Sequence, residues 1–241
     1  MIDVAFTLEE VSRQRLTGLS VVVIDVVRAS TTIVTALAHG ARGVLPVATP
    51  EDALARARAW PAGEAVVGGE RGGSPPPGFD CGNSPAEYTP ERVAGRTVVF
   101  TTTNGTRALL AVEGARRVAV GGFVNARAVV AWLVRQGSDV LLVCAGESGR
   151  FCLEDAACAG VLADGFRAAR PEAFVSDSAR AAGLLHAHYA GDLGAMLDDA
   201  AWAQMLVAQG RGADLPLCAA LDAFDVVPVA RDRVLVGERV H

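Results

Sequence analysis

The stretch VVVIDVVRAST, residues 21–31, decides the fold and points to the functional site. Its first half is a run of β-branched apolar residues, which predicts a buried strand over 20–26. Its second half supplies Asp25, Arg28, Ser30 and Thr31, and apolar residues at helical spacing then predict a helix over 31–39. A continuously apolar strand followed by a polar loop and a helix is the repeating unit of parallel α/β sheets.

The same alternation continues along most of the chain. Further strands are predicted over 2–6, 43–47, 65–68, 97–101, 118–120, 139–144, 226–229 and 233–236. Helices are predicted over 51–60, 106–113, 126–136, 153–169, 177–189 and 193–209, with a short one near Leu217. Pro228 places its strand near a sheet edge or a bulge. The pattern predicts an α/β fold, a single domain over 1–241 whose largely parallel sheet is covered by helices on both faces.

Composition narrows the class of protein. A chain of 241 residues with 51% hydrophobic content can bury a full core, and its five cysteines are expected to be free thiols. The net charge of -5 argues against nucleic acid or an anionic membrane as partner. No apolar run is long enough to span a bilayer and no signal peptide is evident, so we expect a cytoplasmic protein that acts on a small molecule.

The basic residues exclude one further class of mechanism. All 22 of them are arginines, so mechanisms that need a lysine, such as Schiff-base chemistry or a Walker loop, are ruled out. Anions must therefore be held by arginine, by backbone N–H groups or by a metal ion.

Polar side chains follow several predicted strands at their carboxyl ends, where ligands bind in open parallel sheets. The loops supply Asp25, Arg28, Ser30 and Thr31; Thr101, Thr102, Thr103, Asn104, Thr106 and Arg107; Cys144, Glu147, Ser148, Arg150, Glu154 and Asp155; and, from the Gly/Pro-rich loop over 68–85, Glu70, Arg71 and Asp80. Hydroxyls and arginines suit an anion, whereas carboxylates would repel it unless a divalent cation lies between them. The set therefore predicts a phosphate-and-metal site.

Each of these residues also has a plain structural interpretation. Ser30 or Thr31 could simply cap the next helix, Asn104-Gly105 could be an ordinary turn, and Glu154 with Asp155 could complement a helix N-terminus.

Several longer motifs resemble a known family. IDVVRASTTIVTAL, GGERGG, FDCGNSPAEYT, TTTNGTRA, CAGESGRFCLEDAACAG and FDVVPV are similar to the 2-phosphosulfolactate phosphatase family, the ComB proteins of coenzyme M biosynthesis. The resemblance covers about residues 20–230. It implies a three-layer α/β/α fold with a mixed, largely parallel sheet, and a Mg²⁺-dependent phosphatase that hydrolyses 2-phospho-3-sulfolactate or a related 2-hydroxy acid phosphate. It also picks out Asn83 and Ser84 beside the residues above.

Chemistry suggests a role for each candidate. We expect catalytic roles for Asp25, Glu70, Glu147 and Arg150. The expected Mg²⁺ ligands are Asp25, Glu70, Asp80, Glu147 and Glu154. The expected substrate-binding residues are Arg28, Ser30, Thr31, Arg71, Thr102, Thr103, Asn104 and Arg107.

Other mechanisms stay open at this point. Asp25 could attack phosphorus itself, although the second Asp of a DxD motif is Val27 here. Cys144 and Arg150 have the spacing of a cysteine phosphatase loop, although Glu147 would oppose a thiolate there. A non-catalytic binding protein for a phosphorylated 2-hydroxy acid would use the same arginines. The apolar helices over 177–209 could pack on the sheet or join two copies as a homodimer.

Overall fold

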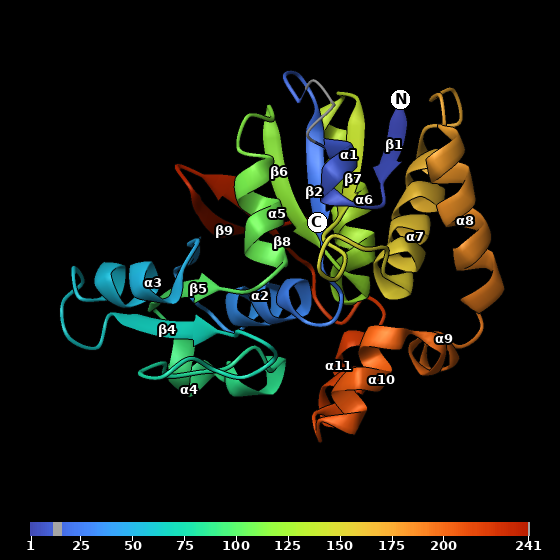
Figure 1. Ribbon diagram of the computed structural model, residues 1–241. Coiled ribbons are helices and arrows are strands. Elements are labelled where there is room, and N and C mark those ends of the chain that lie inside the picture. The colour runs from blue at the N-terminus through green and yellow to red at the C-terminus, as the bar shows by residue number, and fades with distance from the viewer. Residues whose placement is uncertain (12–15, 241) are drawn as a thin grey trace.

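The computed structural model describes residues 1–11 and 16–240 and shows a single mixed sheet (Figure 1). Its nine described strands run in the order β1-β7-β2-β6-β8-β9-β3-β5-β4. Their bounds are β1 Ile2–Ala5, β2 Ser20–Ile24, β3 Gly43–Pro46, β4 Ala65–Gly69, β5 Thr97–Thr101, β6 Arg117–Gly121, β7 Val140–Cys144, β8 Val226–Arg231 and β9 Val234–Arg239.

Helices connect and cover these strands. They are α1 Leu8–Val11, α2 Ala29–Ala38, α3 Pro50–Ala57, α4 Pro90–Val93, α5 Gly105–Ala111, α6 Ala126–Gln136, α7 Leu153–Ala169, α8 Asp177–Tyr189, α9 Leu193–Asp199, α10 Ala201–Ala208 and α11 Leu215–Cys218. Single 3₁₀ turns lie at Pro85–Glu87, Phe123–Asn125 and Gly212–Asp214. None of the described helices combines the length and the apolar character needed to cross a bilayer.

The sheet consists of two parallel blocks joined by an antiparallel hairpin. Strands β1, β7, β2 and β6 are parallel to one another, and so are β3, β5 and β4. The β8–β9 hairpin pairs antiparallel with both blocks, and its register is recorded at one residue pair on each side, Ala119↔Val229 and Val44↔Leu235. In Figure 1 the first block runs downward and β4 runs toward the right, so the carboxyl ends of both blocks point to the centre.

Alternating side chains of the central strands build a core on each face of the sheet. In β2, Val22 and Ile24 pack into the cluster that α6, α7, α8 and α10 cover. Val21 and Val23 pack on the opposite face with residues of α2 and α5. On the second block, α3 closes a smaller cluster over β4 and β5. Helices thus cover both faces of a mixed, largely parallel sheet, which confirms the predicted three-layer α/β/α architecture.

Apart from shifts of up to three residues at the ends of elements, two element predictions differ from the structure. The helix predicted over 193–209 is two helices, α9 and α10, because Ala200 adopts an extended backbone (φ -77°, ψ 117°). The strand that carries Pro228 is not at an edge, since β8 lies between β6 and β9. Proline is tolerated there because the pairing of β8 with β6 is brief. The single domain over 1–241 stays a prediction.

Candidate active site

Asp25 follows the last residue of β2 and lies at the point where the two blocks converge. Its Oδ1 accepts a hydrogen bond from the backbone N–H of Ala29 (3.2 Å), and its own N–H donates to Ser30 Oγ (2.9 Å). Its side chain meets the loop after β5, because a Cβ added at Gly105 would lie 2.7 Å from Asp25 Oδ2. Glycine at position 105 therefore allows α5 to begin directly against this carboxylate.

Glu70 follows β4 and is fixed by the neighbouring loop. Its Oε1 accepts the N–H of Thr103 (2.7 Å), and its Oε2 accepts the N–H of Gly73 (2.7 Å) and the hydroxyl of Thr103 (3.3 Å). Gly69 has a positive φ of 131°, and a Cβ there would lie 1.9 Å from the carbonyl oxygen of Thr101. This close approach, which glycine permits, positions Glu70 beside β5.

The loop after β7 contributes Glu147, which contacts the loop after β5. Asn104 Nδ2 donates to Glu147 Oε2 (2.6 Å), Ser148 Oγ donates to Glu147 Oε1 (2.6 Å), and the N–H of Ser148 donates to Asn104 Oδ1 (3.3 Å). Strands far apart in the sequence thereby place their loops side by side, as the sequence predicted.

Two further acids lie in the first turn of α7 and are buried. Asp155 accepts the N–H of Val26 (2.8 Å) with one oxygen and the N–H of Gly146 (3.0 Å) with the other, so it joins the loops after β2 and β7. Glu154 is 2% exposed, and its buried Oε2 has no hydrogen-bond partner among the described residues. A buried, unpaired carboxylate oxygen is costly, which points to a missing cationic or donor partner.

The acids of the site, Asp25, Glu70, Glu147, Glu154 and Asp155, lie near one another without a positively charged side chain paired to them in the described part of the chain. Burial, together with the negative charges of Glu70, Glu154 and Glu147, raises the pKa of Asp25 to about 7, although the Ala29 N–H opposes the shift. Burial also raises the pKa of Asp155 and of Glu154, with further contributions from neighbouring carboxylates. In the described part of the chain, none of these acids forms an ion pair with an arginine.

The four arginines expected at the site differ in how far the protein itself engages their side chains. Arg28, expected to bind substrate, is 4% exposed and pairs with Asp214 (2.6 Å). Arg71, also expected there, donates to the carbonyls of Glu70 and Ala48 and to the hydroxyl of Thr101. Both guanidinium groups are thus engaged by the protein itself. Arg107 and Arg150 are exposed.

The hydroxyls expected to bind anions mainly fasten the loops. Thr31 is 1% exposed and donates to the carbonyl of Val26 (2.9 Å), and Ser30 accepts from Asp25. Thr102 Oγ1 accepts the N–H of Thr106 at the start of α5 (3.2 Å). Thr103 and Asn104 are only partly buried, beside Glu70 and Glu147, so of this set they are the ones best placed to meet a ligand.

Asp80 does not join the acids at the centre. Its Oδ2 accepts the N–H of Val67 in the middle of β4 (2.8 Å). It lines a separate surface cavity with Arg92 and Arg96, close to the amino end of β4. Glu70 follows the opposite end of that strand, so the structure does not bring Asp80 together with Asp25, in contrast to the expected ligand set.

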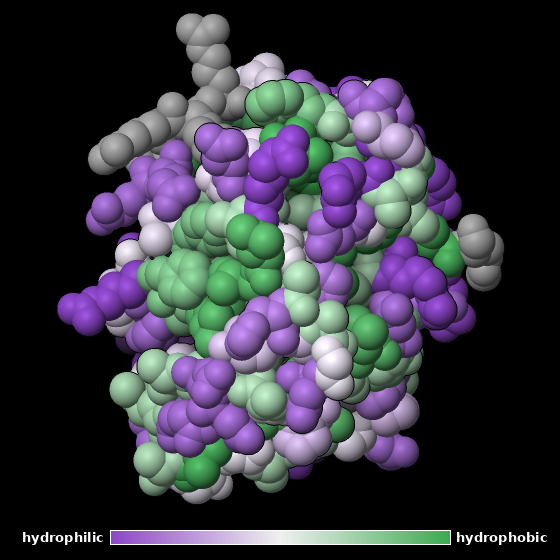
Figure 2. All heavy atoms as spheres, turned by 90° about the vertical axis from the view of Figure 1, so that its right-hand side faces the viewer, coloured by the Kyte–Doolittle hydropathy of each residue, from purple (hydrophilic) through white to green (hydrophobic). Residues whose placement is uncertain are grey.

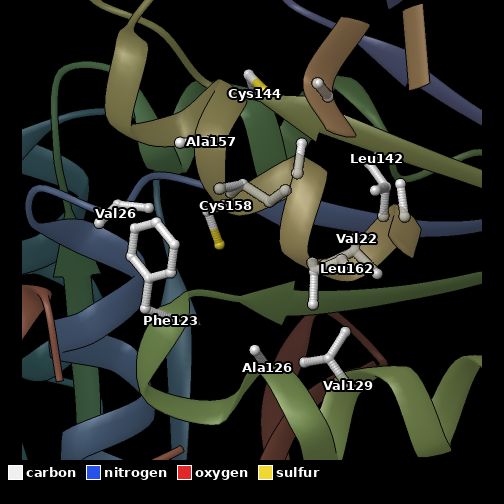
Figure 3. Close-up of a cluster of buried hydrophobic side chains, with 14 of the residues drawn as sticks. Val22, Val26, Phe123, Ala126, Val129, Leu142, Cys144, Ala157, Cys158 and Leu162 are labelled. Atoms are coloured by element: carbon white, nitrogen blue, oxygen red, sulfur yellow. The ribbon is translucent and has the colours of Figure 1, made fainter. Parts of the chain in front are cut away.

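Cys144 does not face the loop that a cysteine phosphatase would need. Its side chain lies among apolar residues of the core between β7 and α7, together with Cys158 and Leu142 (Figure 3). It is fully buried, and burial raises the pKa of its thiol well above the ordinary value. Arg150, its presumed partner in an anion-binding loop, is exposed. The geometry therefore argues against a thiolate nucleophile.

Sequence reasoning missed two residues that organise the site. Asp214 accepts from Arg28 and, through its other oxygen, from Ser84 Oγ (2.5 Å). Trp202 on α10 donates its indole N–H to the carbonyl of Val27 (2.8 Å). Asp214 lies 186 and 130 residues from Arg28 and Ser84, and Trp202 lies 175 residues from Val27. A lone Asp or Trp carries no local signal of such a distant contact.

Comparison with known sequences identifies the family. The family described as 2-phosphosulpholactate phosphatase matches residues 5–233, nearly the whole chain. The chain belongs to the 2-phosphosulpholactate phosphatase family.

Relatives in three organisms illustrate the breadth of this match. A protein of Symbiobacterium thermophilum is 43% identical over 90% of this chain and 93% of its own length. Proteins of Caldanaerobacter subterraneus subsp. tengcongensis and Thermotoga petrophila are 36% and 40% identical, over 90% and 89% of this chain and 89% and 90% of their own lengths. Each carries the name "Probable 2-phosphosulfolactate phosphatase". Family membership makes the chain a phosphoric monoester hydrolase and confirms the resemblance seen in its motifs.

Proposed function

We propose that this protein is a Mg²⁺-dependent phosphatase that hydrolyses 2-phospho-3-sulfolactate, or a closely related 2-hydroxy acid phosphate, to the hydroxy acid and inorganic phosphate. The family and the names of the relatives support the reaction and the ester. The observation that supports a Mg²⁺ cofactor is the buried group of acids formed by Asp25, Glu154 and Asp155. This group has no arginine counter-ion among the described residues. A divalent cation would stabilise the ionised form of these buried carboxylates and offset their mutual repulsion.

The residues present fit a magnesium ion, although they do not form a complete cage for it. Within the described residues no three acidic, histidine or cysteine side chains are arranged to hold a metal together. Mg²⁺ needs no such cage, because it is commonly held by one or two carboxylates, waters and a substrate phosphate. Glu154 Oε2 has no partner, and hydrogen bonds from the described residues engage Asp25 only at Oδ1. Asp25 and Glu154 are therefore the proposed ligands, with Glu70 and Glu147 nearby.

The remaining groups have separable roles in the reaction. When bound, Mg²⁺ would offset the charge of the acids, polarise the phosphoryl group and lower the pKa of a coordinated water. Asp155, held by two backbone N–H groups, keeps the loops after β2 and β7 in register. Thr103 and Asn104 orient Glu70 and Glu147. A carboxylate of this cluster accepts the proton that the attacking water loses, the phosphorus–oxygen bond of the ester breaks, and the departing alkoxide takes up a proton to become the hydroxyl of the 2-hydroxy acid.

Phosphate release tests this proposal. Purified protein stripped of metal is incubated with 2-phospho-3-sulfolactate, 2-phospholactate and phosphoglycolate, each with 5 mM Mg²⁺ or with excess EDTA. We expect release from 2-phospho-3-sulfolactate only with Mg²⁺, and restoration when Mg²⁺ is added back to the chelated sample. Undiminished release in EDTA would reject the cofactor, and failure to hydrolyse any of the esters with Mg²⁺ would reject the function.

A further inference from the structure

The ion pair between Arg28 and Asp214 is buried beside the site and joins segments that are far apart in the sequence. Arg28 is 4% exposed and follows Asp25 in the loop after β2, and Asp214 is 6% exposed in the 3₁₀ turn before α11. In Figure 1, α10 and α11 lie below the first block of strands, on the side to which its carboxyl ends point. A buried ion pair adds little net stability compared with apolar residues of similar size, so stability alone is a weak explanation for it.

The pair leads to Glu70 through an unbroken series of hydrogen bonds. Arg28 Nη1 donates to Asp214 Oδ2 (2.6 Å), and Arg28 Nη2 donates to the carbonyl oxygen of Gly73 (3.2 Å). The N–H of Gly73 in turn donates to Glu70 Oε2 (2.7 Å). The backbone of Gly73 is therefore held by Arg28 and itself holds the carboxylate of Glu70.

The turn over 71–74 meets the C-terminal segment at a second point. Its shape is fixed by two backbone hydrogen bonds between Arg71 and Ser74 (2.9 and 3.2 Å). Arg211, three residues before Asp214, donates from Nη2 to Ser74 Oγ (2.6 Å). The segment over 211–214 thus contacts the tip of the turn directly and contacts its Gly73 through Arg28.

The bond from Arg28 to Gly73 ties the loop of Asp25 to the loop of Glu70. These two carboxylates lie close enough to influence each other, because burial is the largest cause of the raised pKa of Asp25 and Glu70 is the first of the neighbouring charges that add to it. Asp214 contacts Arg28 and Ser84 rather than these acids. Any effect of Asp214 on the reaction must therefore pass through the residues that it holds.

We propose that Asp214 is a positioning residue for the phosphatase reaction, which fixes the carboxylate of Glu70 beside Asp25 through Arg28 and the backbone of Gly73. This inference rests on the proposed function and adds to it a residue of the C-terminal segment. Since Asp214 acts on the placement of one acid, its loss should lower kcat and leave KM nearly unchanged. The loss should also depend on the presence of a carboxylate at position 70.

A double-mutant cycle between Asp214 and Glu70 tests the proposal. The kcat and KM values for 2-phospho-3-sulfolactate with Mg²⁺ are measured for the wild type, Asp214→Asn, Glu70→Gln and the variant with both changes. We expect Asp214→Asn to lower kcat by about 10- to 100-fold, because a small misplacement of a reacting group slows the reaction steeply. In the Glu70→Gln background the same change should lower kcat by less than about threefold, since residues that act through one another have non-additive effects.

The matched control is Glu238→Gln, which makes the same kind of change in another ion pair. Glu238 accepts from Arg231 in the β8–β9 hairpin (2.7 Å), and the arginine of this pair is exposed. Glu238→Gln should match the wild type in kcat and KM.

A further variant separates positioning from stability. Breaking one half of a buried ion pair leaves an uncompensated charge, whereas replacing both members by apolar residues of similar size commonly keeps the fold stable. The variant with Arg28→Met and Asp214→Leu should therefore melt close to the wild-type temperature and still show the kcat loss of Asp214→Asn. Full turnover in this variant would overturn the proposal.

Amide hydrogen exchange gives a readout that does not depend on turnover. The N–H groups of Gly73 and Thr103 both donate to Glu70, so their protection reports how firmly its carboxylate is held. Asp214→Asn should raise the exchange rates of these two amides at least about threefold and leave those of the β8–β9 hairpin unchanged.

Additive losses in the cycle, or faster exchange throughout the chain, would give Asp214 a general stabilising role and overturn the proposal. If the wild type releases no phosphate while Asp214→Asn still speeds exchange at Gly73 and Thr103, the proposed function fails and the placement of Glu70 by Asp214 stands. If the wild type hydrolyses the ester and Asp214→Asn changes neither kcat nor exchange, the function stands and the positioning role fails.

Discussion

The charge state of Asp25 depends on the residues that surround it. An exposed aspartate would be ionised at neutral pH, but burial and three neighbouring acids raise the pKa of Asp25 to about 7. The N–H of Ala29 at the start of α2 is the main opposing influence. Without a cation Asp25 is therefore only partly ionised near neutrality, and a bound cation would favour its ionised form.

We predict that Asp25→Asn lowers kcat by at least about three orders of magnitude without lowering stability, because the amide removes a buried like charge but keeps the shape. Asp80→Asn is the matched control, since Asp80 is exposed and only accepts from Val67. Phosphate release and thermal melting are measured on both. Near-normal turnover in Asp25→Asn, or an equal loss in Asp80→Asn, would remove Asp25 from the mechanism.

A second prediction concerns Cys144, which lies in the core rather than in the site. Cys144→Ala should keep kcat within about threefold of the wild type and should cost roughly 1 kcal/mol of unfolding free energy for the lost sulfur contacts. Chelation of metal should still abolish turnover. The opposite pattern, an inactive variant together with a chelator-resistant wild type, would restore the cysteine mechanism.

At the scale of elements, the start of α5 packs closely against the catalytic carboxylate. A Cβ at Gly105 would lie 2.7 Å from both Asp25 Oδ2 and the Cβ of Ala29, so α5, α2 and the catalytic carboxylate meet at a point where a side chain does not fit. The close approach of two elements, rather than an unusual backbone angle, requires glycine here.

Gly105→Ala should therefore lower kcat by about 100-fold and destabilise the fold by about 1–3 kcal/mol, since the added methyl group pushes α5 away from Asp25. Gly114→Ala just beyond α5 provides the control, because a Cβ there would meet open space. Chemical denaturation and turnover are compared for the two variants. If both behave alike, the joint between α5 and Asp25 is not tight.

Elements with strong local signals could be predicted from the sequence, and those shaped by tertiary contacts could not. The strand over 97–101 and the helices over 153–169 and 177–189 have the predicted bounds, because apolar runs and flanking polar residues mark their ends. The break at Ala200 has no proline or glycine to announce it. The interior position of β8 depends on strand order, which local pattern does not encode.

The candidate site shows the same difference between features with a local sequence signal and features set by tertiary contacts. Its location and most of its acids were predictable, because polar residues follow strands whose carboxyl ends converge. The partners of Arg28 and Arg71 were not, since ion pairing with Asp214 and donation to the Ala48 carbonyl depend on distant segments. The composition of the loop over 68–85 did not distinguish Asp80 from Glu70. In the structure Asp80 accepts a hydrogen bond from Val67 in the middle of β4.

At the scale of the whole molecule, the net charge of -5 is distributed so that several acids are buried together at one point. Figure 2 shows the face that carries α7 and α8, where a hydrophobic area at mid-height on the left has hydrophilic residues above and below it. The homodimer expected through these C-terminal helices stays a prediction. The buried acids have a consequence for stability as a function of pH.

The folded-state pKa of Asp25 is about 7 and its ordinary value is 3.8, so the folded state binds more protons between these values. Stability of the metal-free protein should therefore fall as pH rises from about 4 through 7. Mg²⁺ should offset this loss, so the melting temperature should rise more on adding Mg²⁺ at pH 8 than at pH 5. A cation at 100 times its Kd adds about 2.7 kcal/mol, or roughly 5–10 °C for a chain of this size.

Melting curves with Mg²⁺, and with NaCl at equal ionic strength, provide this measurement. In Asp25→Asn the pH-dependent part of the shift should shrink. A Mg²⁺ effect that is the same at both pH values, or is reproduced by NaCl, would show that the ion does not act through these acids.

The central claim is that acids from separate loops hold one divalent cation. It is tested most directly by titrating the metal-free protein with Mn²⁺ and monitoring the electron paramagnetic resonance signal of the free ion. Mn²⁺ shares the preference of Mg²⁺ for oxygen ligands. We predict one Mn²⁺ bound per chain in the wild type, displaced by Mg²⁺, and weakened at least tenfold in Asp25→Asn and in Glu154→Gln. Absence of binding at millimolar Mn²⁺, or equal binding in the wild type and both variants, would contradict the claim.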